Sequence, residues 1–186
     1  MTDRLFVAVE VPDEARASLE TFVGPRRDAD PDLRWVRPEN WHLTLAFLGD
    51  VPADRQEPLA EALTAVASRT SGFNLALGGA GAFPKPYAAK VLWLGVTTGR
   101  DDLGRLAARV RTACQRVGVP PDPATFAAHL TLARTRRPIE ATKWLRVLEA
   151  FPQPSWRVER FVLVDSTLNR GGSVYRVAAE FSLGTA

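Results

Sequence analysis

Histidine and cysteine are scarce in this chain of 186 residues. It has two histidines, His42 and His129, and one cysteine, Cys114. Two imidazoles are too few for a zinc site built on several histidines, so that class of site is excluded. A single cysteine also excludes a disulfide framework or a cysteine cluster, and it fits a reducing compartment such as the cytosol.

Long apolar runs and a strong charge imbalance are also missing. No segment approaches the roughly 18 to 20 uninterrupted apolar residues of a membrane span, and the N-terminus lacks the charged and apolar regions of a signal peptide. We therefore expect a cytoplasmic protein that has no membrane partner. Since no partner surface stands out in the sequence, we also expect a monomer.

The positive charge is modest and comes almost entirely from arginine. The chain has 24 Lys+Arg against 21 Asp+Glu, a formal net charge of +3. So small an excess argues against a protein that coats long nucleic acid by releasing counter-ions. Arginine side chains suit bidentate phosphate contacts, so the composition is compatible with a small ligand or a chain end that carries a phosphate. Coding bias also explains the arginine content.

Strand and helix signals alternate along the chain. Strands are predicted at residues 5–11, 33–36, 41–48, 73–77, 91–96, 126–133, 158–168 and 174–181. Helices are predicted at 13–22, with Asp13 as the candidate N-cap, at 54–68, with Pro58 in the first turn, at 101–117 and at 140–150. The run 78–86 is expected to be a loop. No linker divides the chain, so we expect one compact α+β unit with mixed or antiparallel sheets and helices packed outside.

Both histidines begin the same tetrapeptide, His-Leu-Thr-Leu, at residues 42–45 and 129–132. In a strand, side chains alternate with a period of two, so each histidine shares a face with the threonine about 6.6 Å further along the backbone. The leucines, and with them Phe47, are expected to face the core. Packing would specify the leucines but would not require imidazoles, so the repeat indicates chemistry.

Two imidazoles with ordinary pKa values near 6.5 can act as one base and one acid at neutral pH. Such a pair suits in-line displacement at phosphorus, in which one histidine deprotonates the attacking oxygen and the other protonates the leaving oxygen. Hydroxyls and arginines would hold the non-bridging oxygens. This chemistry needs no metal and no cofactor.

The two motifs, read with their surroundings, resemble the paired H-x-T-x motifs of the 2H phosphoesterase superfamily. They are most similar to the LigT-like RNA 2′,3′-cyclic phosphodiesterases, also called 2′-5′ RNA ligases. The similarity extends to Arg4-Leu5-Phe6-Val7-Ala8, to Gly81-Ala82-Phe83-Pro84 and to the closing hairpin. One departure is Ala128, where this family often has proline, and it removes no chemical group.

The resemblance implies a bilobal α+β fold over residues 1–186, with two intertwined, pseudo-symmetric lobes of mainly antiparallel sheet, helices outside and a central cleft. It implies that His129 accepts a proton from water and that His42 donates one to the departing 3′ oxygen, which leaves a 2′-phosphate. Thr44, Thr131 and Arg134 would bind the phosphate. Minor, reversible 2′-5′ ligation is a second implied activity.

The sequence also offers two further candidate RNA contacts and is compatible with several other functions. Phe83 could stack on an RNA base and Arg136 could guide the strand, although a loop anchor and a solvated turn are ordinary explanations for such residues. The substrate could instead be a small cyclic nucleotide, an ADP-ribose derivative or a 2′-5′ oligonucleotide. A non-catalytic nucleotide- or RNA-binding module is the alternative from another class, although arginine alone would serve simple phosphate binding.

Overall fold

A computed structural model describes residues 2–169 and 172–184 of the chain. Its strands are β1 (Thr2–Glu10), β2 (Leu33–Trp35), β3 (His42–Pro52), β4 (Phe73–Phe83), β5 (Ala89–Val96), β6 (His129–Ile139), β7 (Ser155–Val158), β8 (Arg160–Asn169) and β9 (Gly172–Ser182). Its α-helices are α1 (Asp13–Val23), α2 (Ala53–Ser68), α3 (Arg100–Arg116) and α4 (Thr142–Leu148). No helix in this part of the chain is long and apolar enough to cross a membrane.

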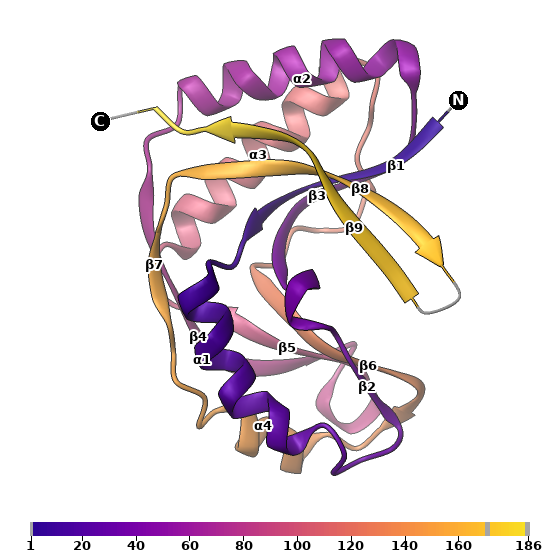
Figure 1. The fold of residues 1–186 in the computed structure, drawn as a ribbon, viewed down its shortest axis with the longest axis vertical. Coiled ribbons are helices and arrows are strands. Elements are labelled where there is room, and N and C mark those ends of the chain that lie inside the picture. The colour runs from indigo at the N-terminus through magenta and orange to yellow at the C-terminus, as the bar shows by residue number, and fades with distance from the viewer. Residues whose placement is uncertain (1, 170–171, 185–186) are drawn as a thin grey trace.

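The strands form one curled sheet in which neighbouring strands pair antiparallel, as expected for the α+β fold class. The order is β7-β4-β5-β6-β3-β1-β8-β9, and β2 pairs with β6 outside this path. Helices α2 and α3 pack against each other and lie beside the β1, β3, β8 and β9 end of the sheet, while α1 and α4 lie at the other end (Figure 1). The two motif strands, β3 and β6, are neighbours at the centre.

Strands β3 and β6 meet at one register pair, Leu43 with Leu130. Both leucines are buried, with exposed fractions of 1% and 0%. Each leucine directly follows a motif histidine, so this contact brings His42 and His129 to the same place in the molecule. Beyond it, β3 pairs with β1 and β6 pairs with β5, each on its other side.

Each motif strand contains a β-bulge at the same point of the repeat. The pairing of β1 with β3 skips Leu45, and the pairing of β5 with β6 skips Leu132. An extra residue shifts the alternation of side chains by one position. As a result, Phe47 emerges on the face that carries His42, and Arg134 emerges on the face that carries His129. The prediction that Phe47 faces the core is therefore wrong.

Two helix predictions need correction at their N-termini. Asp13 is the first residue of α1 and not its cap, which is Pro12; the Asp13 carboxylate accepts a hydrogen bond from Arg16. Pro58 lies inside α2, beyond the first turn where it was expected. Because proline has no N–H to donate, that turn of α2 lacks one backbone hydrogen bond.

Strand β4 continues through the glycine-rich run that was predicted as a loop. The lack of a side chain at Gly81 lets the ring of Trp93, from β5, lie over it, since an added Cβ on Gly81 would lie 2.1 Å from that ring. Gly79 has a φ of +73°, a conformation that favours glycine, at an irregularity of the pairing. Strand β6 likewise differs from its prediction: it begins at His129, not at Phe126, and runs on to Ile139.

The contact between Gly81 and Trp93 predicts the effect of a single methyl group on stability. Gly81→Ala should lower the free energy of unfolding by about 1–3 kcal/mol, because the Trp93 ring has to move in a packed sheet. Gly104→Ala is the matched control: nothing lies within 4 Å of its added Cβ on α3, so it should raise stability by about 0.5–1 kcal/mol. Urea unfolding of both variants tests this, and equal effects of the two would contradict it.

Candidate functional site

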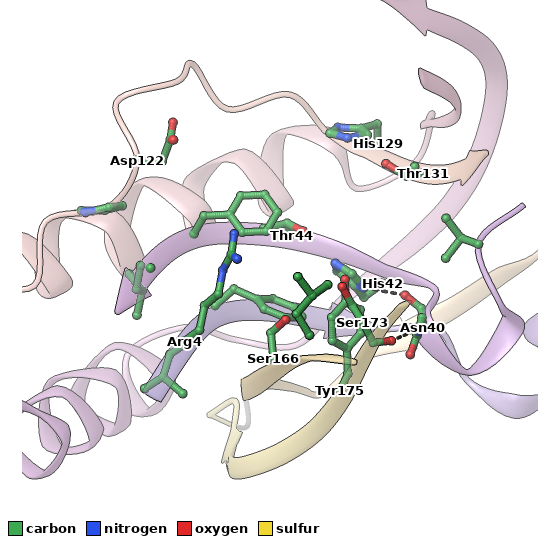
Figure 2. Close-up of a pocket in the computed structure, with 18 of the residues that line it drawn as sticks. Arg4, Asn40, His42, Thr44, Asp122, His129, Thr131, Ser166, Ser173 and Tyr175 are labelled. Atoms are coloured by element: carbon green, nitrogen blue, oxygen red, sulfur yellow. Dashed lines mark hydrogen bonds between the residues drawn. The ribbon is translucent and has the colours of Figure 1, made fainter. Parts of the chain in front are cut away.

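The face that carries both histidines lines a cleft of about 980 Å³ at the centre of the sheet (Figure 2). Strands β1, β3 and β6 and the β8–β9 hairpin supply most of its wall, and residues 120–123 also line it. The sequence-predicted residues that it brings together are His42, Thr44, His129, Thr131 and Arg134.

Both histidines are held by the same backbone contact. The Nδ1 atom of His42 lies 2.7 Å from the carbonyl oxygen of Asn40, and that of His129 lies 2.7 Å from the carbonyl oxygen of Ala127. A carbonyl oxygen only accepts, so Nδ1 carries the proton in both rings. In the neutral imidazole, Nε2 is then the atom with the free electron pair, and each ring presents a base.

Both imidazoles titrate below their ordinary range. Burial lowers the pKa of His42 to about 4, against the hydrogen bond to Asn40, and the nearby charges of His129 and Arg134 lower it further. Burial also lowers the pKa of His129, and Arg134 adds to that effect. At neutral pH both rings are therefore uncharged in the free protein.

Aromatic rings pack around each histidine. The His42 ring lies 4.8 Å from Phe6 and 5.4 Å from Tyr175, measured between centroids. The His129 ring lies 5.0 Å from Phe83 and 6.1 Å from Trp93. These contacts fix the orientation of both imidazoles and supply the apolar surroundings that lower their pKa values.

The two halves differ at the position five residues after each histidine. Arg134 occupies it in β6 and places a guanidinium in the cleft, whereas Phe47 occupies it in β3 and places an apolar ring there. Phe47 is 51% exposed, and its ring lies 5.8 Å from that of Phe6. At this position of the repeat, the cleft therefore has a guanidinium on β6 and an aromatic ring on β3.

The remaining two predicted contacts lie outside the cleft wall. Phe83 packs edge-on against His129 and beside Trp93, so its ring positions the imidazole. Arg136 is exposed on β6, two residues beyond Arg134, and is not among the cleft-lining residues. It lies in a strand, not in the solvated turn that was weighed for it.

Several cleft residues were missed by the sequence reasoning. Arg4 comes from β1, which pairs with the motif strand β3, and Tyr175 comes from β9, which joins the sheet through β8. Asn40 binds His42 through its carbonyl and donates from Nδ2 to the carbonyl of Ser173 at 3.1 Å, so it ties the histidine to the β8–β9 hairpin (Figure 2). The similarity of the closing hairpin was the one signal that pointed toward Tyr175.

Comparison with known proteins gives consistent matches along the chain. The family model described as LigT like Phosphoesterase matches residues 9–93 and again residues 94–175. An RNA 2′,3′-cyclic phosphodiesterase of Geobacillus stearothermophilus is 40% identical over 69% of this chain, which spans 41% of that longer relative. The enzyme of the same name from Archaeoglobus fulgidus is 33% identical, over 93% of this chain and 96% of its own length.

A solved structure shows the same architecture. The crystal structure of Escherichia coli LigT complexed with 3′-AMP superposes with a TM-score of 0.80 at 30% identity. The superposition covers 98% of this chain and 99% of that one.

The lowered pKa of His42 predicts a loss of stability in mild acid. Between pH 6.5 and about 4 the unfolded chain binds a proton at this residue and the folded chain does not, so the free energy of unfolding falls as the pH is lowered through this range. The loss is on the order of 3 kcal/mol, and in His42→Gln this part of the pH dependence should disappear. Urea unfolding at several pH values measures it; parallel pH curves for the two proteins would contradict it.

Proposed function

The chain belongs to the LigT-like phosphoesterase family, and from that premise we propose that it is an RNA 2′,3′-cyclic phosphodiesterase, which hydrolyses terminal 2′,3′-cyclic phosphates to 2′-phosphates. The observation that carries the proposal is the repeated geometry of His42 and His129, each held through Nδ1 by a carbonyl and each lining the same cleft. Two bases that face one cleft from neighbouring strands fit in-line displacement at a phosphorus atom between them.

In the proposed reaction, Nε2 of His129 accepts a proton from water as the water oxygen bonds to phosphorus. The bond from phosphorus to the 3′ oxygen breaks, and Nε2 of His42 donates a proton to that oxygen. The product carries a 2′-phosphate. Thr44, Thr131 and Arg134, which line the cleft beside the histidines, hold the non-bridging oxygens as negative charge builds up on them.

The acid has to acquire its proton before it can donate it. His42 is neutral in the free protein at pH 7, and its Nδ1 proton is held by Asn40, so the donor form is the imidazolium. The cyclic phosphate is an anion, and an anion beside His42 raises the pKa of the imidazole. Substrate binding thus leads to protonation of His42, the acid, while His129 stays neutral as the base.

The substrate class rests on the relatives. Several are named RNA 2′,3′-cyclic phosphodiesterase, and the LigT structure described above contains 3′-AMP. A nucleotide with a phosphate on its ribose is therefore the ligand that we infer for this cleft, with Phe83 and Arg136 at most as outer RNA contacts. We further infer that the protein acts as a monomer, since one chain supplies both histidines.

Replacing either histidine should abolish most of the turnover. We expect His42→Ala and His129→Ala each to lower kcat for a 2′,3′-cyclic phosphate by about 10²-fold or more, the effect of losing an acid or a base. Tyr87→Ala, an exposed aromatic residue outside the cleft, is the control. The assay uses nucleoside 2′,3′-cyclic phosphates and a cyclic-phosphate-ended RNA, with chromatographic identification of the product isomer.

Three results of that assay discriminate between the alternatives. Near-wild-type turnover in either histidine variant contradicts the mechanism, and binding without turnover by the wild type favours the non-catalytic module. A 3′-phosphate product reverses the assignment of the leaving oxygen. RNA halves with a 5′-hydroxyl end, added at high concentration, test ligation, because a hydroxyl in place of water would give a 2′-5′ linkage; absence of joined product argues against it.

Arg134 should control the pH dependence as well as the rate. Both histidine pKa values lie below 6.5, so kcat/KM, which reports the free enzyme, should peak below pH 6.5 and fall at higher pH as His42 loses its proton. Removing the cation in Arg134→Gln raises both pKa values, so the profile should move to higher pH while its maximum falls. Arg136→Gln, further along the strand, should keep the wild-type profile shape; an unshifted profile in Arg134→Gln would refute this electrostatic role.

A further inference from the structure

The β8–β9 hairpin projects away from the rest of the sheet (Figure 1). The pairing of β1 with β8 ends at Leu5 with Asp165, although both strands continue beyond that pair. We refer to residues 166–168 and 173–175 as the distal hairpin. Residues from both of its strands line the cleft. The pairing with β1 therefore leaves unfixed a part of the wall that the site needs.

Two kinds of contact join the distal hairpin to the rest of the protein. The ring of Tyr175 lies 5.0 Å from that of Phe6 and 5.4 Å from that of His42, measured between centroids. The Nδ2 atom of Asn40 donates a hydrogen bond to the carbonyl oxygen of Ser173 at 3.1 Å (Figure 2). Among the described residues, this is the side-chain hydrogen bond that links the distal hairpin to another element.

Asn40 is itself held in a rigid turn. It ends the short 3₁₀ turn Pro38–Asn40, and its backbone N–H donates to the carbonyl oxygen of Arg37 at 2.9 Å. The next residue, Trp41, is buried and donates its N–H to the carbonyl oxygen of Pro38 at 3.1 Å. The amide of Asn40 is thus presented to the hairpin from a fixed position.

The repeat supplies an internal comparison for the Asn40 side chain. Ala127 stands two residues before His129, as Asn40 stands two residues before His42, and both carbonyl oxygens lie 2.7 Å from Nδ1 of the imidazole. Alanine has no polar side chain, so this contact needs the backbone alone. The amide of Asn40 therefore serves the hairpin and not the imidazole directly.

The two imidazoles also differ in where their aromatic cover comes from. The rings around His129 belong to β4 and β5, which pair with each other, and β5 pairs with β6. The rings around His42 are Phe6, from the neighbouring strand β1, and Tyr175, from the distal hairpin. Part of the cover of His42 thus depends on an element that needs a separate link to stay in place.

We propose that Asn40 is a positioning residue for the acid of the reaction. Its amide holds the distal hairpin, the hairpin holds Tyr175 against His42, and this packing keeps the imidazole buried and oriented. The role of His42 as the acid rests on the proposed function, whereas the coupling of Asn40 to the imidazole does not.

An NMR titration of the tag-free protein measures this coupling, because the chain has two histidines and therefore two imidazole curves. Asn40→Ala keeps the carbonyl that accepts from His42 and removes the amide. Water should then reach the ring. Since burial is the main cause of its lowered pKa, the pKa of His42 should rise by about one unit. His129 should keep its pKa, which also shows that the cleft of the variant is folded.

The charged groups around His42 stay in place in this variant. They are His129 and Arg134 on β6 and Glu10, its register partner on β1, which pairs with Arg160. None of them is the partner of the Asn40 amide. A rise in the pKa therefore reports lost burial and not a lost charge.

Two further variants show whether Asn40 acts through Tyr175. Tyr175→Leu should also raise the pKa of His42, and adding Asn40→Ala to it should change that pKa little further, because both act on the same ring contact. Full additivity of the two shifts would contradict the coupling. Asn74→Ala, at an exposed asparagine on β4 outside the cleft, is the matched control and should leave both titration curves unchanged.

Kinetics with nucleoside 2′,3′-cyclic phosphates test the consequence for the reaction. In Asn40→Ala, the alkaline limb of kcat/KM should move to higher pH by the same amount as the pKa of His42. At the optimum of its own profile, kcat should be about 10-fold lower, because a displaced acid transfers its proton less efficiently. A merely structural loss would not shift the profile.

The outcomes separate this inference from the proposed function. An unchanged pKa of His42 in Asn40→Ala, or equal shifts of both histidines, overturns the coupling and leaves the function in place. A shifted pKa with unchanged kcat overturns the role of Asn40 in positioning the acid. If the wild type turns over no cyclic phosphate, the proposed function fails, and the titration still decides whether Asn40 controls the imidazole.

Discussion

Leu43 and Leu130 form the contact on which the geometry of the cleft depends. They are the register pair through which β3 and β6 meet, and each is held in the core directly behind a motif histidine. Side chains alternate along a strand, so burying these two leucines turns His42 and His129 to the other face, where the cleft opens. The hydrophobic core thus brings together two imidazoles that lie far apart in the sequence.

The local structure of the repeat then makes the two sites equivalent before any ligand binds. Both rings donate Nδ1–H to the carbonyl two residues earlier, and both strands bulge at the second leucine of the motif. Acid and base are therefore chemically alike, and their difference has to come from the surroundings. Among the described residues, Phe47 in place of an arginine and the hydrogen bond from Asn40 to the β8–β9 hairpin distinguish the His42 side.

The sequence predicted the parts of the site that depend on a short pattern. Alternation in the two tetrapeptides correctly placed each histidine on one face with its threonine, and all four residues line one cleft. Alternation did not place Phe47 correctly, because the β-bulge at Leu45 shifts the alternation of side chains by one residue. No residue type around Leu45 signals this bulge in the sequence. Arg4 and Tyr175 lie on strands whose neighbours are set by the whole sheet, so no local signal brings them to the cleft.

The prediction of a loop in the glycine-rich part of β4 was wrong for a related reason. Glycine usually indicates a loop, yet here the lack of a side chain at Gly81 is what lets Trp93 lie across the sheet and reach His129. Residue propensities do not predict this strand, because it depends on the packing of Trp93 over Gly81. The same packing supplies apolar surroundings for the imidazole of His129.

Burial of both histidines fits an anionic substrate better than a neutral one. A lowered pKa keeps each ring uncharged in the empty cleft, and the neighbouring Arg134 makes a charged ring still less favourable. A bound phosphate reverses this balance, since its charge offsets Arg134 and favours one imidazolium beside it. In the proposed reaction, His42 therefore takes up the proton for the leaving oxygen when the substrate binds.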